Sequence, residues 1–303
     1  MLSIRDLVKV YPGPVAALQG VRLDIPQGMF GLLGPNGAGK STLMRILAGL
    51  LEPTSGTAEL DGQEITSEPA RVWSRLGYLP QDFGFYPNLT GEQMLEHLLA
   101  LKGVESPLGK KKLVAELLER VNLSAAGKRK VKTYSGGMRQ RLGIAQAIAG
   151  DPRLLIVDEP TAGLDPEERL RFYHLLAELA EGRIVLLSTH IVEDVSVLCP
   201  RFAILAEGRL VAETTPVEAR TLIEGAIFEG SVAKGGLDEL RARCHVTQSM
   251  LVEGRLRVRI WRQDGQVPPG FEPVRATLED AYLVLTRRGR AAREEQLLAG
   301  AAR

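Results

Sequence analysis

The stretch GPNGAGKST, residues 34–42, decides the fold of this 303-residue chain. It matches the pattern G-x-x-x-x-G-K-[ST] in full, follows an apolar run and leads into a helix-forming run. Glycines at 37 and 39 let backbone N–H groups turn toward a β-phosphate, and the helix N-terminus adds partial positive charge. Lys40 is expected to reach the β- and γ-phosphates, and Ser41 to ligate Mg²⁺. The alternative, a plain glycine turn between strand and helix, would not need Lys and Ser in this register.

A second candidate for chemistry is LLIVDEP, residues 154–160, where a buried strand ends in two carboxylates. The carboxyl end of a parallel strand faces the ligand crevice, so Asp158 is the expected partner of an Mg²⁺ held by Ser41. Glu159 points near the same metal, and one of the pair can accept a proton from an attacking water. The alternative is an ordinary turn at the end of the strand, before Pro160. The presence of a complete phosphate loop in the same chain makes this alternative the weaker of the two.

Two further polar residues are ambiguous on their own. His190 ends the buried strand IVLLSTH at the ligand edge, where a γ-phosphate contact and a purely structural role are both open. Gln81 follows LGYLP, and its amide either ligates Mg²⁺, orients a water or is simply solvated.

The order of the predicted elements indicates an α/β fold. Strands and helices alternate over residues 1–215 with short connections, which is typical of a mainly parallel sheet covered by helices. Residues 82–150 are predicted mostly helical, because GEQMLEHLLALKG and KKKLVAELLERVNL place apolar residues at helical spacing. Residues 216–303 predict a small α+β unit with three strands, a short helix, a Gly- and Pro-rich loop at 263–273, a closing helix and an Ala-rich tail.

Composition restricts the class of partner. Lys and Arg number 38 and Asp and Glu 37, a net charge of +1, so bulk charge does not favour a nucleic-acid partner and none is expected. Cys199 and Cys244 form no C-x-x-C pair, which favours a reducing cytoplasm over a disulfide framework. The start MLSIRDLVKVY has no signal-peptide pattern, and no apolar run approaches the roughly 18 residues that span a membrane. We expect a soluble chain that can work at a membrane by docking.

A second anion-binding turn occurs far downstream, at YSGGMRQR, residues 134–141. Ser135, Gly136 and Gly137 open a predicted helix, whose N-terminus can offer a hydroxyl, backbone N–H groups and its dipole to an anion. One nucleotide cannot easily use two phosphate loops on distant parts of one domain. These stretches resemble those of the ATP-binding cassette family, and the resemblance implies that this turn contacts the γ-phosphate of ATP bound to a second copy, which favours a dimer.

Together these stretches resemble the ATP-binding subunit of an ATP-binding cassette (ABC) transporter, over about residues 1–215. They correspond to the family's phosphate loop (GPNGAGKST), Gln loop (YLPQ), signature (YSGGMRQR), Walker B strand (LLIVDEP), dimer-contact loop (GLDP) and switch histidine (STH). The resemblance implies a P-loop NTPase with a mainly parallel sheet core, an antiparallel β subdomain and a helical subdomain at about 82–150. Residues 216–303 would be a small C-terminal α+β accessory domain and tail.

The resemblance also implies roles for single residues, with ATP and Mg²⁺ as the ligands. Glu159 would polarise the water, His190 would hold the γ-phosphate together with Lys40, and Tyr11 would stack on adenine. Gln81 would contact Mg²⁺ and sense the membrane partner. The expected nucleotide contacts are Tyr11, Gly34, Pro35, Asn36, Gly37, Ala38, Gly39, Lys40, Ser41, Thr42, Gln81, Ser135, Gly136, Gly137 and Asp158. The expected Mg²⁺ ligands are Ser41, Gln81 and Asp158.

Two features of the chain resemble the branch of the family that exports drugs, lipids or polysaccharides. The signature has Tyr134 and Met138 where Leu and Gln are usual. The segment TLEDAYLVLTRR resembles the helix that ends many ATPases of that branch. It would place Leu278, Ala281, Tyr282 and Leu285 on one helical face, although a plain packing helix is an equal alternative.

The leading hypothesis is an ATPase subunit that energises a separate membrane permease, bound peripherally to the cytoplasmic face and paired with a second copy of itself. Residues 82–93 would receive the permease, and the aromatic residues Phe83, Phe85 and Tyr86 would suit an apolar contact. The alternative is a soluble ABC-type ATPase of translation or DNA repair, which generally carries two cassettes or a long coiled coil. A non-catalytic ATP-binding regulator would be expected to lack Lys40 or Glu159, and both are present.

Overall fold

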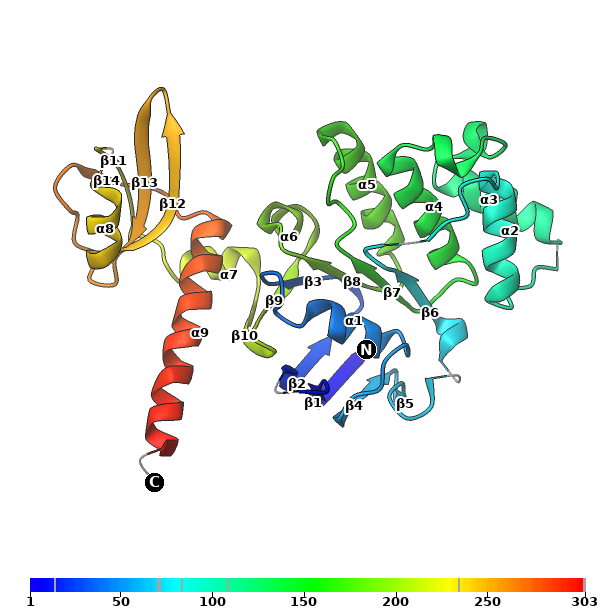
Figure 1. Cartoon of the computed structure of the whole chain (residues 1–303), viewed down its shortest axis with the longest axis horizontal. Helices are drawn as coiled ribbons and strands as arrows, with labels where there is room; N and C mark the ends of the chain where they lie inside the picture. Colours follow the sequence, from blue (N-terminus) through cyan, green and yellow to red (C-terminus); the bar gives the residue numbers. More distant parts are fainter. Residues whose placement is uncertain (14, 70–71, 83, 108, 234, 302–303) are drawn as a thin grey trace.

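The centre of the molecule is a six-stranded sheet (Figure 1). The computed structural model describes residues 1–13, 15–69, 72–82, 84–107, 109–233 and 235–301. The strand order is β10-β9-β3-β8-β7-β6, and every neighbouring pair is parallel except β9 and β10. The strands are β3 (Gly28–Leu33), β6 (Leu76–Leu79), β7 (Leu154–Asp158), β8 (Ile184–Thr189), β9 (Arg201–Ala206) and β10 (Arg209–Thr214). The predicted mainly parallel core is confirmed.

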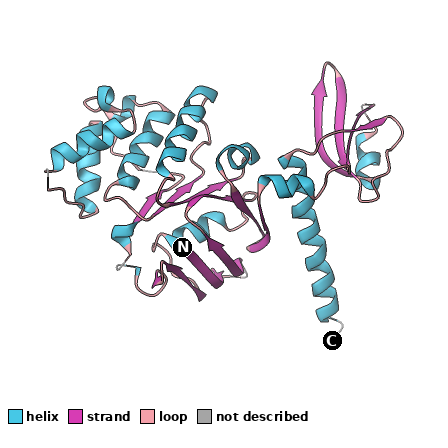
Figure 2. Ribbon diagram, turned by 180° about the vertical axis from the view of Figure 1, so that it is seen from behind, coloured by secondary structure: helices cyan, strands magenta, loops and turns pink. Residues whose placement is uncertain are grey.

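Both faces of this sheet are covered, which explains why β7 and β8 are fully buried and apolar up to their carboxyl ends. Leu155 and Val157 of β7 face a core that includes α4 (Gly136–Ile148), α5 (Pro166–Leu179) and α6 (Val192–Leu198). Leu154 and Ile156 face the opposite core, which includes α1 (Lys40–Leu47). Seen from behind, these helices and α1 lie on opposite sides of the strands (Figure 2).

A second, antiparallel sheet covers α1 and has the order β2-β1-β4-β5. Its strands are β1 (Leu2–Val10), β2 (Ala16–Ile25), β4 (Ser55–Leu60) and β5 (Gln63–Glu64). This sheet confirms the expected antiparallel β subdomain. Strand β2 pairs antiparallel with β1 from Ile25 back to Ala16, which lies opposite Val10.

Helices α2 (Gly91–Leu101) and α3 (Lys110–Arg120) pack with α4 at one end of the central sheet. Thr90 caps α2 through a capping box, in which its hydroxyl oxygen accepts from the Gln93 N–H while the Gln93 side chain accepts from the Thr90 N–H. The apolar faces of α2 and α3 join the same core as α4. The helical region is thus an extension of one core, and its limits at about 82–150 stay a prediction.

The C-terminal region forms a third sheet beside the central sheet and its helices, with the order β12-β13-β11-β14 (Figures 1 and 2). Its elements are α7 (Pro216–Thr221), β11 (Ile227–Val232), α8 (Leu237–Arg243), β12 (His245–Val252), β13 (Arg255–Trp261), β14 (Phe271–Pro273) and α9 (Leu278–Ala301). The prediction of a loop over residues 263–273 was wrong at its C-terminal end, because β14 pairs with β11 there. The boundary at 215/216 stays a prediction.

Helix α9 joins this sheet to the core. Leu278 and Ala281 are buried on its inner face, and Tyr282 and Leu285 pack against the same core, so the predicted shared face is confirmed. Asp280 has no exposed surface and accepts hydrogen bonds from Thr247 Oγ1 of β12 at 2.5 Å and Arg259 Nη2 of β13 at 2.8 Å. Within the described part of the chain, no helix has the length and apolar character needed to cross a membrane.

Candidate active site

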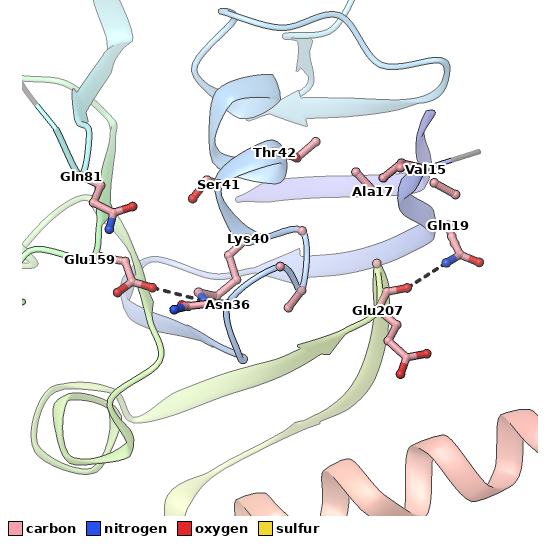
Figure 3. Close-up of a pocket in the computed structure, with 15 residues that line it drawn as sticks. Val15, Ala17, Gln19, Asn36, Lys40, Ser41, Thr42, Gln81, Glu159 and Glu207 are labelled. Carbon is pink, nitrogen blue, oxygen red and sulfur yellow. Dashed lines mark hydrogen bonds and ion pairs between the residues drawn. The ribbon is translucent and has the colours of Figure 1, made fainter. Parts of the chain in front are cut away.

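A cavity of about 770 Å³ lies beside the phosphate loop, residues 34–42 (Figure 3). Every residue from Asn36 to Thr42 lines it, together with Gln81, Glu159 and the start of β2. The cavity therefore brings together four candidates from three distant parts of the chain: Lys40, Ser41, Gln81 and Glu159.

The phosphate loop closes tightly around the first residue of α1. Gly39 has φ 103°, and a Cβ at this position would lie 2.4 Å from the Ala17 carbonyl oxygen, so only glycine fits. Lys40 Nζ donates to the Gly34 carbonyl oxygen at 2.7 Å and to that of Pro35 at 3.2 Å. These two carbonyls hold the lysine side chain along the inside of the loop, facing the cavity.

Glu159 lies between the other two candidate catalytic groups. Its Oε1 is 3.2 Å from Lys40 Nζ, and its Oε2 contacts His190 Nδ1. The Lys40 and Glu159 side chains are 5% and 6% exposed, whereas that of His190 is 43% exposed. Glu159 has φ 51°, a left-handed conformation that costs roughly 1–2 kcal/mol in a non-glycine residue. Its N–H donates to the Ser188 carbonyl oxygen at 2.9 Å, which holds this turn and aims the carboxylate at the lysine.

Asp158 is a buried carboxylate with an unused oxygen. It is 2% exposed, and its Oδ1 has no hydrogen-bond partner among the described residues. Burial raises the pKa of this carboxyl, and the Ser188 and Ser41 hydroxyls act in the opposite direction. Mg²⁺ prefers hard oxygen ligands and keeps places for phosphate oxygens and water. The free Asp158 oxygen near the Ser41 hydroxyl fits such an ion.

Replacing Asp158 by Asn is expected to raise the free energy of unfolding of the nucleotide-free chain at pH 7 by about 1 kcal/mol, because no charge is left to desolvate. The carboxyl pKa is raised in the folded chain, so wild-type stability falls as pH rises above the usual value of 3.8 through the raised one. Urea unfolding at pH 4 and pH 7 without Mg²⁺ measures this difference, with Asp238→Asn at a 95% exposed carboxylate as control. Equal stability of variant and wild type at pH 7 would contradict the account.

A buried carboxylate that the sequence did not reveal lies behind Glu159 and His190. Asp194, in the first turn of α6, has no exposed surface. Its Oδ2 accepts from Thr161 Oγ1 at 2.6 Å and Thr189 Oγ1 at 2.8 Å, and its Oδ1 accepts from the Tyr173 hydroxyl at 2.6 Å. Asp194 therefore ties together the segments after β7 and β8. A polar residue in the first turn of a helix looks solvated in sequence, so nothing marked it.

Replacing Asp194 by Ala is expected to lower the free energy of unfolding by about 3–5 kcal/mol, because three buried hydroxyls lose their acceptor. The neighbouring variant Glu193→Ala is the control, since that side chain is 69% exposed and lies 3.5 Å from Arg169. Equilibrium urea unfolding of both variants measures their free energies of unfolding relative to the wild type. Losses of similar size in the two would show that the buried network contributes little.

Three of the candidates, Ser135, Gly136 and Gly137, lie away from this cavity. They begin α4, which packs on the face of the central sheet opposite α1. The Ser135 hydroxyl oxygen accepts from the Met138 N–H at 3.2 Å, which leaves its own hydrogen free to donate. A Cβ at Gly137 would lie 2.3 Å from Glu168 Oε2. The signature turn is thus a well-formed helix start that no nucleotide in this chain's own cavity contacts.

The remaining candidates border the cavity in different ways. The Tyr11 hydroxyl is 3.3 Å from Thr42 Oγ1, but Tyr11 itself does not line the cavity. The cavity is lined on this side by Val15, Ala16 and Ala17. Stacking of Tyr11 on adenine stays a prediction. The unusual Tyr134 is 3% exposed and its hydroxyl donates to the Ala126 carbonyl oxygen at 2.9 Å, so it is a core residue.

A complete phosphate loop between a parallel strand and a helix, with a buried lysine and two strand-end carboxylates, defines a P-loop nucleoside triphosphatase. Residues 18–162 match the family model described as ABC transporter. The chain is 40% identical over 257 residues to the daunorubicin/doxorubicin resistance ATP-binding protein DrrA of Streptomyces peucetius, covering 84% of this chain and 74% of DrrA. The chain belongs to the ABC transporter family, as one of its ATP-binding proteins, and is an ATPase.

Two further comparisons agree with this assignment. The linearmycin resistance ATP-binding protein LnrL of Bacillus subtilis (strain 168) is 34% identical over 268 residues, which cover 86% of this chain and 85% of LnrL. Among solved structures, the dimeric post-hydrolysis state of the ATP-binding cassette MJ0796, bound to ADP and Pi, is similar with a TM-score of 0.64 at 29% identity. It covers 71% of this chain and 98% of that one. The P-loop NTPase fold is thereby confirmed.

Proposed function

We propose that this chain binds and hydrolyses ATP in the 770 Å³ cavity and thereby powers a separate membrane permease that exports its substrate. The observation that carries the proposal is the position of Glu159, whose carboxylate touches Lys40 on one side and His190 on the other. The names of DrrA and LnrL, which refer to resistance, support export as the direction of transport.

Hydrolysis is assigned to the chain's own side chains as follows. Lys40 binds the β- and γ-phosphates, which draws its ammonium from Glu159 toward the nucleotide. Glu159 then orients a water and accepts its proton, and His190 holds a γ-phosphate oxygen. Ser41, Asp158 and Gln81 would hold Mg²⁺, which when bound neutralises charge that develops on the phosphate oxygens. Gly34, Pro35 and Ala38 contribute through the backbone of the loop.

The working unit we propose is a head-to-tail pair of two identical chains. The signature turn Ser135–Gly137 has a free hydroxyl hydrogen and a helix N-terminus, yet it lies on the opposite side of the sheet from its own phosphate loop. A two-fold axis would place each turn on the γ-phosphate held by the other chain. The dimeric structures of the similar cassette MJ0796 support a two-chain assembly.

Residues 82–93 are proposed as the docking site for the permease, which would hold the chain on the cytoplasmic face of the membrane. Tyr86 is 57% exposed, and its ring meets that of His97 edge to face at 5.4 Å. Phe85 is partly buried against the core, so it supports this surface from below, and Phe83 lies outside the described residues. Of the two predicted aromatic residues that the structure describes, Tyr86 is the more exposed and is available for an apolar contact.

Purification of the chain from its native membrane tests the proposal. The expected result is a complex with a membrane-embedded partner of about six apolar spans that hydrolyses ATP only with Mg²⁺ present. Co-purification with ribosomes or DNA and no membrane partner would favour the soluble ATPase of translation or DNA repair. A complex that hydrolyses no ATP would reject the proposed role.

A further inference from the structure

A second large cavity lies in the C-terminal region, far from the phosphate loop. It measures about 500 Å³ and is bounded by the end of α8, the paired strands β12 and β13, and the middle of α9. Its lining is strongly cationic, with a single carboxylate, Asp264, against five arginines: Arg241, Arg243, Arg262, Arg287 and Arg288. None of these residues has a part in the proposed hydrolysis.

The positive charge of this cavity is only partly neutralised. Asp264 accepts hydrogen bonds from Arg262 through both carboxylate oxygens and from the Gln266 N–H at 3.2 Å. Arg243 pairs with Glu239 at 2.9 Å on the outer surface, where the two side chains are 76% and 67% exposed. Such exposed pairs contribute little and exchange readily for a better partner. Arg287 has no carboxylate partner among the described side chains. Arg287 is therefore available to bind an added anion, and Arg243 can exchange Glu239 for one.

The floor of the cavity is aromatic and contains an unsatisfied polar atom. The Arg288 guanidinium lies 4.9 Å from the centre of the Trp261 ring, and the His245 ring meets Trp261 edge to face at 5.9 Å. Buried His245 Nδ1 has no hydrogen-bond partner in the described part of the chain. Burial and the charge of Arg287 lower the pKa of His245, which keeps the ring neutral at pH 7. A bound anion would offset the neighbouring positive charge.

The frame around the cavity is fixed rather than loose. Buried Asp280 at the start of α9 binds Thr247 of β12 and Arg259 of β13, so the helix and sheet hold a constant separation. Guanidinium groups present paired donors that match phosphate oxygens, and they stay charged at every physiological pH. Preformed walls with several such groups are what a phosphate site requires, because little ordering is needed on binding.

We propose that this arginine cavity is a binding site for a phosphate-bearing ligand, separate from the catalytic site and independent of the function proposed above. A soluble phosphate compound and a phospholipid headgroup share this chemistry, and both would be held by the Arg243 and Arg287 guanidinium groups above the Trp261–His245 floor. Occupancy would let the C-terminal region respond to a metabolite in the first case and to the membrane surface in the second.

The histidines provide a local readout, since the chain has only four of them. The full chain is titrated with inorganic pyrophosphate at pH 7, while the ring resonances of His245 and of His190, at the catalytic site, are followed by NMR. A parallel arm measures co-sedimentation with vesicles of phosphatidylcholine, with and without phosphatidylglycerol. The cavity variant is Arg243→Gln/Arg287→Gln. Its control, Arg255→Gln/Arg257→Gln, removes two positive charges as well, but from exposed positions on β13 that do not line the cavity.

Saturable movement of the His245 resonance by pyrophosphate is expected for a soluble ligand, with affinity at least about tenfold weaker in the cavity variant and unchanged in the control. Phosphatidylglycerol-dependent sedimentation that is lost only in the cavity variant supports the headgroup instead. The proposal is overturned if neither probe binds, or if the two double variants weaken binding equally. Movement of His190 alone would report the catalytic site and would count against a second site.

Discussion

A chain carrying Glu159→Gln is expected to bind ATP with nearly unchanged affinity but to hydrolyse it at least about 100-fold more slowly. The amide keeps the size of the carboxylate, so Lys40 and the phosphate loop keep their geometry. The amide cannot accept a proton from water, so the proton acceptor between Lys40 and His190 is lost. Because ATP stays intact, the two chains of the proposed dimer remain closed, and the variant should accumulate as an ATP-bound dimer.

Single-turnover hydrolysis with radiolabelled ATP, followed by size-exclusion chromatography with ATP and Mg²⁺, measures both effects. Glu167→Gln is the matched control, since that carboxylate is 77% exposed on α5, where it pairs with Arg171. A Glu159→Gln chain that hydrolyses ATP at the wild-type rate would remove Glu159 as the group that activates the water.

Replacing Lys40 by Met is expected to weaken ATP binding at least about 100-fold and to abolish hydrolysis, because the ammonium that cradles the β- and γ-phosphates is lost. The same change leaves the Glu159 carboxylate buried without its cation. Breaking a buried ion pair in this way costs about 3–5 kcal/mol, so the nucleotide-free variant should also be less stable.

The double variant Lys40→Met/Glu159→Gln separates the two effects of the lysine. It should regain most of the lost stability, because no uncompensated charge stays buried, and it should remain unable to bind ATP tightly. Nucleotide titration and urea unfolding of the four members of the cycle are compared with Lys110→Met, an exposed lysine of α3. Additive stability losses would show that Lys40 and Glu159 do not interact in the folded chain.

Contiguous features of the site could be predicted from the sequence. The phosphate loop is set by glycines and a lysine within nine residues, and the carboxylates follow directly from a strand that is apolar throughout. The parallel order of the central strands also followed from strand–helix alternation. These predictions succeed because local pattern and tertiary environment demand the same residues.

Features assembled from distant parts of the chain could not be foreseen. The hydroxyls that bind Asp194 come from three separate segments, and the residue itself looks like any acid in a first helical turn. The pairing of β14 with β11 depends on three residues that lie within a Gly- and Pro-rich segment. The arginine cavity likewise collects residues from α8, β13 and α9, none of which forms a motif on its own.

In the proposed dimer, each ATP site is shared between the phosphate loop of one chain and the signature turn of another. Mixing two inactive chains, one with Lys40→Met and one with Ser135→Arg, tests it most directly. A mixed dimer would contain one intact site, formed by the wild-type phosphate loop of the second chain and the wild-type signature of the first.

ATPase activity is measured for each variant alone and for the equimolar mixture, with the permease present. We expect each variant to be inactive alone and the mixture to recover up to about a quarter of wild-type activity, because random pairing makes half of the dimers mixed and each mixed dimer has one working site. A mixture no more active than its separate components, beside an active wild-type control, would contradict the shared site.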